Sequence, residues 1–488
     1  MRSVLTLDSH SGRRLVMAGL LLVAACCFLP FLFMGLSRES LEVLLIPIAV
    51  IWFAILAISR PAAALMVYVF LAAVSMRCEF LVLQGNKISG GIFFSQVLLA
   101  VFLIGWMMRY TARLEREPRA SLSLSLPLLG LAVIPFVSVL SAYVTWDPEV
   151  STVHRKLVVQ LAGASLIFLA AAAAFLTAVV VKSVSHARAI VTIMVGIASL
   201  AFFDVLGLFN TPGKALIFTV APLAFTFALY APTHSRRFLW LTLLIPPFII
   251  AIQAIKVTLL VALILPVLFA SFAHSRRAFF ITLAALIAGY LILGAALGKS
   301  PALRVYEKAK RMQDFDRILL FQKAVGTWKE HPLFGVGPGG QFAYLDGEHF
   351  YGTAHSLYGN FLMETGLFGM IFLLWVIGAA VLMGWKAFRF CRYPPRARGP
   401  DNPEFAFMRT FTLGQTAGFL GMAVAGLFSD TMLPAVQNGG MYMFGASVYL
   451  WILLGVTAAF RRMQLEGKVG QAADLNLYSE LEHPRAST

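Results

Sequence analysis

Long apolar runs follow one another along almost the whole of this chain of 488 residues. A helix needs about 20 apolar residues to cross the hydrocarbon core of a bilayer. Only helices and closed barrels satisfy the backbone in lipid, and runs this long lack the alternating pattern of a barrel. The sequence therefore predicts an all-α fold, a polytopic membrane bundle of about fourteen transmembrane helices. The predicted spans are 15–36, 41–59, 62–82, 92–109, 123–144, 157–181, 189–208, 214–231, 237–253, 255–273, 279–297, 356–384, 409–428 and 441–459.

The composition excludes a soluble globular protein. Hydrophobic residues make up 59% of the chain and charged residues 13%, with a mean hydropathy of +0.82, whereas a soluble domain carries roughly 25% charged residues. The net charge of +16 is attributed to lysines and arginines that orient the helices in the membrane. No nucleic-acid partner is expected. The cysteines at 26, 27, 78 and 391 have the spacing of neither a disulfide framework nor a metal site.

The distribution of lysine and arginine predicts how the chain is oriented. With a cytoplasmic N-terminus and alternating spans, 24 of the 39 lysines and arginines fall on the cytoplasmic side and 7 in short outer loops. Cytoplasmic loops carry such an excess, so both termini are predicted to be cytoplasmic. The first apolar run, Leu15–Leu36, is longer than the roughly 7–15 residues of a signal-peptide core, and we expect it to be a retained helix.

One connection is much longer than the others. Residues 298–355 are predicted to face outward, after an N-terminal bundle over 1–297 of about eleven helices and before three helices over 356–460. Residues 461–488 are expected to form a cytoplasmic tail. Long loops in compact proteins are usually functional or disordered, and the aromatic residues of this loop argue against disorder. We therefore expect the chemistry of the protein in this extracytoplasmic loop.

The loop contains a predicted helix and then a glycine-rich turn. In Phe315–Lys329 the apolar residues recur at helical spacing, which predicts an amphipathic helix. We expect this helix to lie on the outward-facing surface of the membrane that the chain spans, in contact with membrane lipids. Pro332 ends this helix, and four glycines follow within His331–Gly340. Glycine permits tight turns and the close approach of a backbone to a ligand. No Gly-Lys-Ser or Gly-Lys-Thr follows, so this is not a nucleotide-binding loop.

A set of residues in this part of the chain matches a family pattern. The set is Arg317, Trp328, Pro332, Gly335, Gly337, His355, Glu364 and Gly366. It resembles the O-antigen ligase and O-antigen polymerase superfamily of bacterial envelopes. That superfamily has an arginine, a short helix with an aromatic residue, Pro-x-x-Gly-x-Gly, a variable stretch, and a histidine that opens a helix with Glu-x-Gly further on.

The chain departs from the family pattern at several positions. Ser356 stands where the family has an asparagine after the histidine. Lys256 is the candidate replacement for the arginine of a Ser-Arg-Gly motif at an outer helix boundary. Lys214 is the cation in the segment nearest to an upstream Gly-Arg…Pro-Asn motif.

The resemblance implies a metal-independent glycan transferase, multi-pass in the bacterial inner membrane, that acts at the outer face of that membrane. Such proteins move a saccharide from an undecaprenyl diphosphate carrier to an acceptor hydroxyl, on lipid A core for a ligase or on another lipid-linked glycan for a polymerase. Arg317 is the expected diphosphate ligand, with Lys214 and Lys256 beside it, because a guanidinium bonds phosphate in a bidentate manner. His355 is the expected general base. No cofactor is expected.

Glu364 is a third candidate catalytic residue. An ionisable residue inside a membrane is costly and is therefore often functional, and Asp204 and Asp430 share this property. All three are predicted near the outer ends of their helices. The alternative interpretation is that these acids pair with Lys214 and Lys256 and hold the bundle together.

A transporter or flippase of a lipid-linked saccharide is the alternative function. Such a protein would show internal symmetry and polar groups near the middle of the membrane. No internal repeat is visible here, and the charges cluster at the predicted outer face, which favours the enzyme. A ligase, a polymerase and a relative that glycosylates protein share the motif set, so the sequence leaves these three open.

Overall fold

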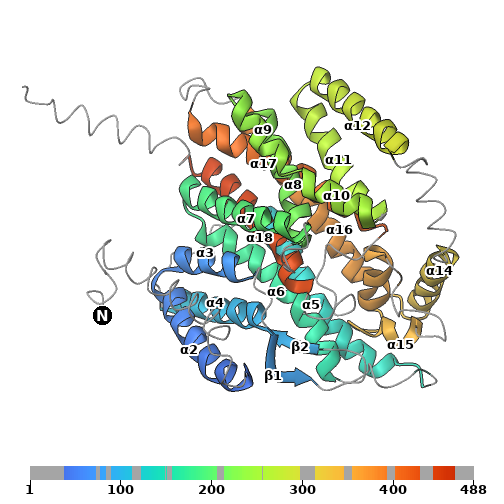
Figure 1. Ribbon diagram of the computed structural model, residues 1–488. Coiled ribbons are helices and arrows are strands. Elements are labelled where there is room, and N and C mark those ends of the chain that lie inside the picture. Colours follow the sequence, from blue (N-terminus) through green and yellow to red (C-terminus); the bar gives the residue numbers. More distant parts are fainter. Residues whose placement is uncertain are drawn as a thin grey trace, which may run out of the picture.

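The structure is a computed structural model of the chain, shown in Figure 1. It describes residues 38–72, 77–83, 90–112, 122–148, 150, 157–205, 214–254, 257–296, 314–345, 354, 356–392, 402–428 and 443–467. The helices in these residues are α2 (Arg38–Ser59), α3 (Pro61–Leu71), α4 (Phe94–Thr111), α5 (Leu122–Thr145), α6 (Leu157–Val180), α7 (Val184–Val205), α8 (Lys214–Leu229), α9 (His234–Thr242), α10 (Ile245–Ala254), α11 (Val257–His274), α12 (Arg276–Ala296), α14 (Asp314–Glu330), α15 (Gln341–Leu345), α16 (Leu357–Arg392), α17 (Pro403–Ala425) and α18 (Met443–Leu465).

The predicted helical membrane bundle is confirmed in outline. Most predicted spans coincide with an observed helix to within a few residues, and the span 15–36 lies outside the described residues. By length and composition, four helical segments in the described part of the chain can each cross a membrane, and shorter apolar helices accompany them. The four are Phe94–Thr111, Leu124–Thr145, Gln160–Val180 and Leu357–Arg392. The total of about fourteen spans stays a prediction.

The predicted span 62–82 is wrong in its second half. Helix α3 ends at Leu71, and residues Arg77–Leu83 form strand β1, which pairs antiparallel with β2 (Gly90–Phe93). Arg77 and Glu79 interrupt the apolar run, and charged residues at the centre of a membrane helix are costly. The chain therefore adds a small hairpin to an otherwise helical fold.

The predicted span 237–253 is divided into two short helices. Helix α9 ends at Thr242, and α10 begins at Ile245. Pro246 and Pro247 occupy the first turn of α10, where a missing backbone N–H costs nothing. None of the residues of α9 is buried, so this helix lies at the surface.

Helix α6 is the central helix of the bundle (Figure 1). In the 18-residue apolar stretch that qualifies Gln160–Val180 as a membrane span, 83% of the residues are buried. Its main neighbour is α18, where Gly455 lies so close to the backbone of Ala174 that a Cβ would clash. Trp451 of α18 is fully buried in the same core.

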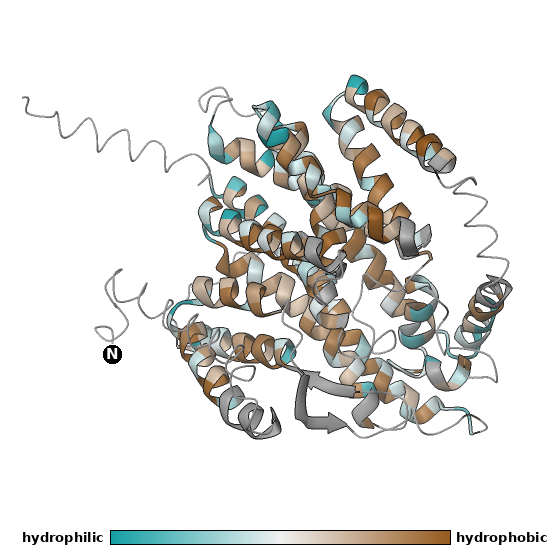
Figure 2. Cartoon of the chain, viewed as in Figure 1, coloured by the Kyte–Doolittle hydropathy of each residue, from teal (hydrophilic) through white to brown (hydrophobic). Residues whose placement is uncertain are grey.

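The outer helices expose large apolar side chains, and much of the ribbon of these helices is coloured brown, for hydrophobic residues, in Figure 2. On α12, Phe280, Leu291 and Ile292 are all exposed. A soluble monomer rarely exposes several large apolar side chains along one helix. Lipid is the solvent that such a surface requires, which supports an integral membrane protein.

Candidate active site

The predicted loop helix is confirmed as α14, which runs from Asp314 to Glu330. Trp328 donates a hydrogen bond from its ring Nε1 to the carbonyl oxygen of Pro332, at 3.1 Å. This bond ties the end of α14 to Pro332, and the N–H of Gly335 closes the following turn by donating to the carbonyl oxygen of His331, at 3.1 Å. The glycine-rich segment then crosses to α16, as the lower right of Figure 1 shows.

Helix α16 is broken at Gly366, and the glycine-rich loop fills the break. Gly366 has φ 65° and ψ −163°, so the helix stops and restarts at this residue. The break leaves two carbonyl oxygens and two N–H groups without helical partners. The carbonyl oxygens of Met363 and Glu364 accept from the N–H groups of Val336 and Gly337, at 2.9 and 3.0 Å.

The other side of the break is bonded to the start of the loop. The N–H groups of Leu367 and Phe368 donate to the carbonyl oxygens of Pro332 and Leu333, at 2.9 and 3.3 Å. Four backbone hydrogen bonds thus join the Pro-x-x-Gly-x-Gly segment to the Glu-x-Gly segment. The two halves of the family motif form one structural unit.

Three glycines of this unit are required by their backbone geometry. Gly335, Gly337 and Gly366 all have positive φ, at 69°, 83° and 65°, a region that other residues rarely adopt. A Cβ on Gly335 would clash with the carbonyl oxygen of Met363, and one on Gly366 would clash with the backbone of Leu333. Gly335 therefore lies close against the α16 backbone, and the approach of the loop to a ligand stays a prediction.

Glu364 reaches back from α16 to the same loop. Its Oε1 accepts a hydrogen bond from the N–H of Gly339, at 2.7 Å, and its side chain is only 7% exposed. A carboxylate that accepts from a backbone N–H forms a strong, charge-assisted bond. Glu364 is thus bonded to the loop through both its side chain and its main-chain carbonyl.

Two buried glutamines near the loop were not singled out from the sequence, Gln160 of α6 and Gln341, which begins α15 directly after the loop. A Cβ on Gly337 would lie 2.6 Å from Oε1 of Gln160 and 2.9 Å from Cβ of Ala142, so the loop packs directly on α5 and α6. Gln160 and Gln341 are both fully buried. Oε1 of Gln160 and both amide atoms of Gln341 have no hydrogen-bond partner among the described residues. The sequence did contain one indication for Gln160, because a polar amide inside a predicted membrane span is unusual and often functional.

The loop is also attached to the end of α5 through Tyr344. The N–H of Asp147 donates to the hydroxyl oxygen of Tyr344, at 2.9 Å. The rings of Trp146 and His331 each pack edge-on against that of Tyr344, with centroids 5.2 and 5.7 Å away. Burial in this contact lowers the pKa of His331, against the opposing effect of Glu330 and Asp147.

Ser356 directly precedes α16 and caps its first turn. Its hydroxyl oxygen accepts from the N–H of Gly359, at 3.3 Å, which is the usual bond of a serine that caps a helix. The N–H of Ala354 donates to Oδ1 of Asn360, at 2.8 Å. The departure from the family's asparagine at position 356 therefore keeps a capping residue at this end of α16.

Several predicted site residues lie outside the described part of the structure. His355, Lys256 and Asp430 are among them, although both chain neighbours of His355 are described. Arg317 is placed in α14 and Lys214 begins α8, but the side chains of both lie outside the described residues, as does that of Asp204. The structure brings together Gly335, Gly337 and Glu364. The roles predicted for these residues stay predictions.

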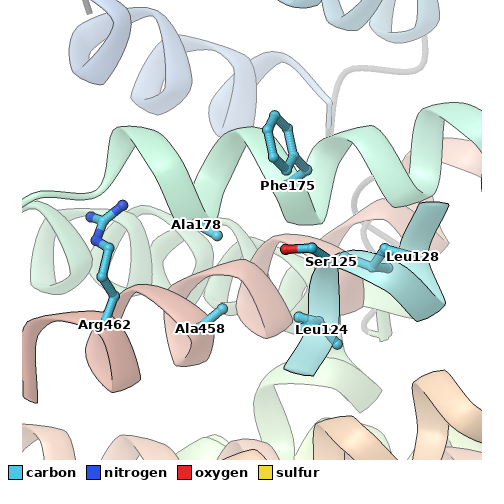
Figure 3. A pocket seen from close by; sticks show the side chains of 7 residues that line it. All are labelled: Leu124, Ser125, Leu128, Phe175, Ala178, Ala458 and Arg462. Atoms are coloured by element: carbon cyan, nitrogen blue, oxygen red, sulfur yellow. The ribbon is translucent and has the colours of Figure 1, made fainter. Parts of the chain in front are cut away.

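A separate small pocket lies away from the loop, between the start of α5 and the ends of α6 and α18. Figure 3 shows the residues that line it: Leu124, Ser125, Leu128, Phe175, Ala178, Ala458 and Arg462. Arg462 donates from Nη2 to the carbonyl oxygen of Val181, at 2.7 Å, so its guanidinium is engaged with the end of α6. Within the described residues, no group of three or more His, Cys, Asp or Glu side chains is arranged to hold a metal ion.

Comparison with known proteins identifies the part of the chain that carries the motif. The family model described as O-Antigen ligase matches residues 197–374, from α7 through the break in α16. This match confirms the resemblance over that part of the chain. No curated protein matches the chain.

Proposed function

We propose, from the match of residues 197–374 to the O-antigen ligase family, that this protein is a metal-independent glycan transferase of the bacterial inner membrane. Its donor is a saccharide on undecaprenyl diphosphate, and its acceptor is a hydroxyl of lipid A core or of another lipid-linked glycan. The observation that carries the proposal is the joining of the glycine-rich loop to the break at Gly366, inside the matched segment.

The proposed reaction is a displacement at the anomeric carbon of the donor sugar. The acceptor oxygen attacks that carbon, and the bond from the carbon to the diphosphate oxygen breaks. Arg317 binds the diphosphate and stabilises the charge that it gains as it leaves. His355 takes the proton of the acceptor hydroxyl. Lys214 and Lys256 are proposed as further diphosphate ligands.

A packing contact supports bringing Arg317 and His355 to one place. Phe321 lies one helical turn after Arg317 on α14, and Gly359 lies four residues after His355. A Cβ on Gly359 would lie 3.0 Å from Cδ2 of Phe321, so α14 and the first turn of α16 are in direct contact. Because one turn of helix rises about 5.4 Å, this contact favours a common site for the two residues.

The broken helix also bears on the alternative of a transporter. Discontinuous helices are common in transporters, where the free backbone groups bind substrate or ions. At Gly366 the free groups are bonded to the loop instead. This arrangement favours the enzyme, in which the break fixes a catalytic loop.

Transfer by the purified protein from a lipid-linked donor tests the proposal. Arg317→Lys should lose most activity because an ammonium cannot replace the bidentate guanidinium. His355→Ala should bind donor but transfer it about 10²–10⁴-fold more slowly. EDTA should leave the wild-type rate unchanged. Near-normal turnover per folded molecule in both variants would remove these residues from the mechanism.

The sizes of the envelope glycans in a deletion strain distinguish the two acceptors. Loss of attachment with free lipid-linked polymer identifies a ligase, whereas single uncapped repeats identify a polymerase. Labelling of Asp346→Cys in a cysteine-free background tests the outward orientation of the loop. Reaction in intact cells supports it, and reaction only after the inner membrane is permeabilised contradicts the proposed topology.

A further inference from the structure

A cluster of arginine, tyrosine and histidine lies at the end of α16 that is far from the loop. Tyr230 directly follows α8, His274 is the last residue of α11, and Arg392 is the last residue of α16. Arg409 completes the cluster from the second turn of α17. Figure 1 shows these helix ends at the top of the bundle, with α14 and α15 at the opposite end.

The two arginines are held against an aromatic pair. The guanidinium carbon of Arg409 lies 4.5 Å from the ring centroid of Tyr230, in a cation–π contact. The rings of Tyr230 and His274 meet edge-on, with centroids 4.7 Å apart. Arg392 donates to the carbonyl oxygens of Ala273 and His274, at 2.6 and 3.5 Å. These contacts fix both guanidinium groups beside one imidazole.

The cluster carries an excess of positive charge. Arg237, at the start of α9, joins Arg392 and Arg409 in acting electrostatically on His274. The described parts of α8, α9, α11, α12, α16 and α17 contain two carboxylates, Glu364 at the loop end and Glu404 in the first turn of α17. The same elements add five further cations toward this end, Arg236, Arg276, Arg277, Lys386 and Arg389. The local field therefore attracts an anion.

Arg409 has a donor that is not used by the described residues. Its Nε is buried and has no hydrogen-bond partner among them. A guanidinium carries five N–H donors in a fork that matches the oxygens of phosphate. A buried donor without a partner is costly, and a phosphate oxygen would satisfy it.

We propose that Arg237, Arg392 and Arg409 form a binding site for a phosphate group, separate from the transfer site at the loop. The favoured source is the headgroup of an anionic phospholipid. On α9, Phe238 and Leu239 are 71% and 63% exposed beside Arg237, as suits a short amphipathic helix that rests on a bilayer surface. Basic pockets between membrane helices are known to bind phospholipid headgroups.

Lipid binding to the purified full-length protein tests the site. The probes are vesicles of phosphatidylglycerol, vesicles of phosphatidylcholine, and inorganic phosphate alone, and the readouts are bound lipid by native mass spectrometry and the shift in Tm. We expect phosphatidylglycerol to bind and to raise Tm more than phosphatidylcholine does. An equal effect of inorganic phosphate alone would assign the site to free phosphate and not to a lipid.

Matched variants locate the binding. Arg409→Gln should weaken phosphatidylglycerol binding about tenfold, the size expected for one charge-assisted hydrogen bond. Arg237→Gln should also weaken binding. Because the side chain of Arg237 is exposed, this variant should fold and can test the site even if Arg409→Gln does not fold. Arg236→Gln removes the same charge from the neighbouring residue, which contributes only to the general field, and it should weaken binding less than Arg237→Gln does. Equal loss in Arg236→Gln and Arg237→Gln, or no loss in Arg237→Gln, would overturn the proposal.

Discussion

The carboxylate of Glu364 accepts a hydrogen bond from the N–H of Gly339, at 2.7 Å, across 25 residues of sequence. The same residue accepts from Gly337 through its main-chain carbonyl, at 3.0 Å. Glu364 therefore bonds the loop twice, immediately before the break at Gly366. This geometry supports a second role for a residue that is predicted to be catalytic, namely the positioning of the loop.

Substitution of Glu364 separates these two roles. Glu364→Gln keeps an oxygen for the Gly339 N–H, so we expect the free energy of unfolding to fall by less than about 1 kcal/mol. Glu364→Leu leaves that buried N–H unpaired and should cost about 1–3 kcal/mol. If Glu364 acts by position, Glu364→Gln should transfer glycan at close to the wild-type rate. If Glu364→Gln is stable but inactive, the negative charge of Glu364 is required for the transfer reaction itself.

Gly366→Ala should disrupt the junction between the loop and α16. Alanine rarely adopts the φ of 65° and ψ of −163° found here, and its Cβ would clash with the backbone of Leu333. The strain alone costs about 1–3 kcal/mol, and we expect a lower Tm with loss of transfer. Gly378→Ala, in the same helix with open space around it, is the matched control and should raise the unfolding free energy by about 0.5–1 kcal/mol. Equal stability of the two variants would show that the break is not required.

The stability of the loop should depend on pH through His331. Burial lowers the pKa of His331 in the folded protein below its usual value of about 6.5. As pH falls, the unfolded chain therefore binds the proton first, so the contribution of His331 is fully present above its unfolded pKa of about 6.5 and is lost as pH falls from there through the lower folded pKa. We expect Tm to fall more steeply between about pH 7.5 and pH 5.5 in wild type than in His331→Gln. Parallel curves for the two proteins would contradict this prediction.

Gln341→Leu should raise or preserve the stability of the folded protein. The direction of the change in Tm also shows whether the amide of Gln341 has a partner. Both polar atoms of this buried side chain lack a partner among the described residues, and an unpaired buried group costs about 1–3 kcal/mol. An apolar side chain of similar size removes that cost, so Tm should rise. Gln415→Leu, which changes a buried amide of α17 away from the loop, is the comparison. A fall in Tm specific to Gln341→Leu would indicate an ordered water or another partner at this amide.

Residue order and apolar periodicity were enough to predict the helical membrane bundle and the loop helix α14. Each of these features depends on local chemistry, namely on runs long enough to span lipid and on apolar residues at helical spacing. The errors have a local cause as well. The predicted span 62–82 includes Arg77 and Glu79, which interrupt the apolar run, whereas the chain ends α3 at Leu71 and forms a hairpin.

The sequence by itself determined the membrane bundle, the position of the glycine-rich loop and the family to which residues 197–374 are matched. Only the tertiary structure showed that α16 is broken at Gly366, because the predicted span 356–384 runs through that glycine and the hydrogen bonds that fill the break come from about 30 residues away. The sequence also could not predict that Tyr230, His274, Arg392 and Arg409 would lie together. Their four helix ends converge through packing between helices, and no local periodicity records which ends will meet.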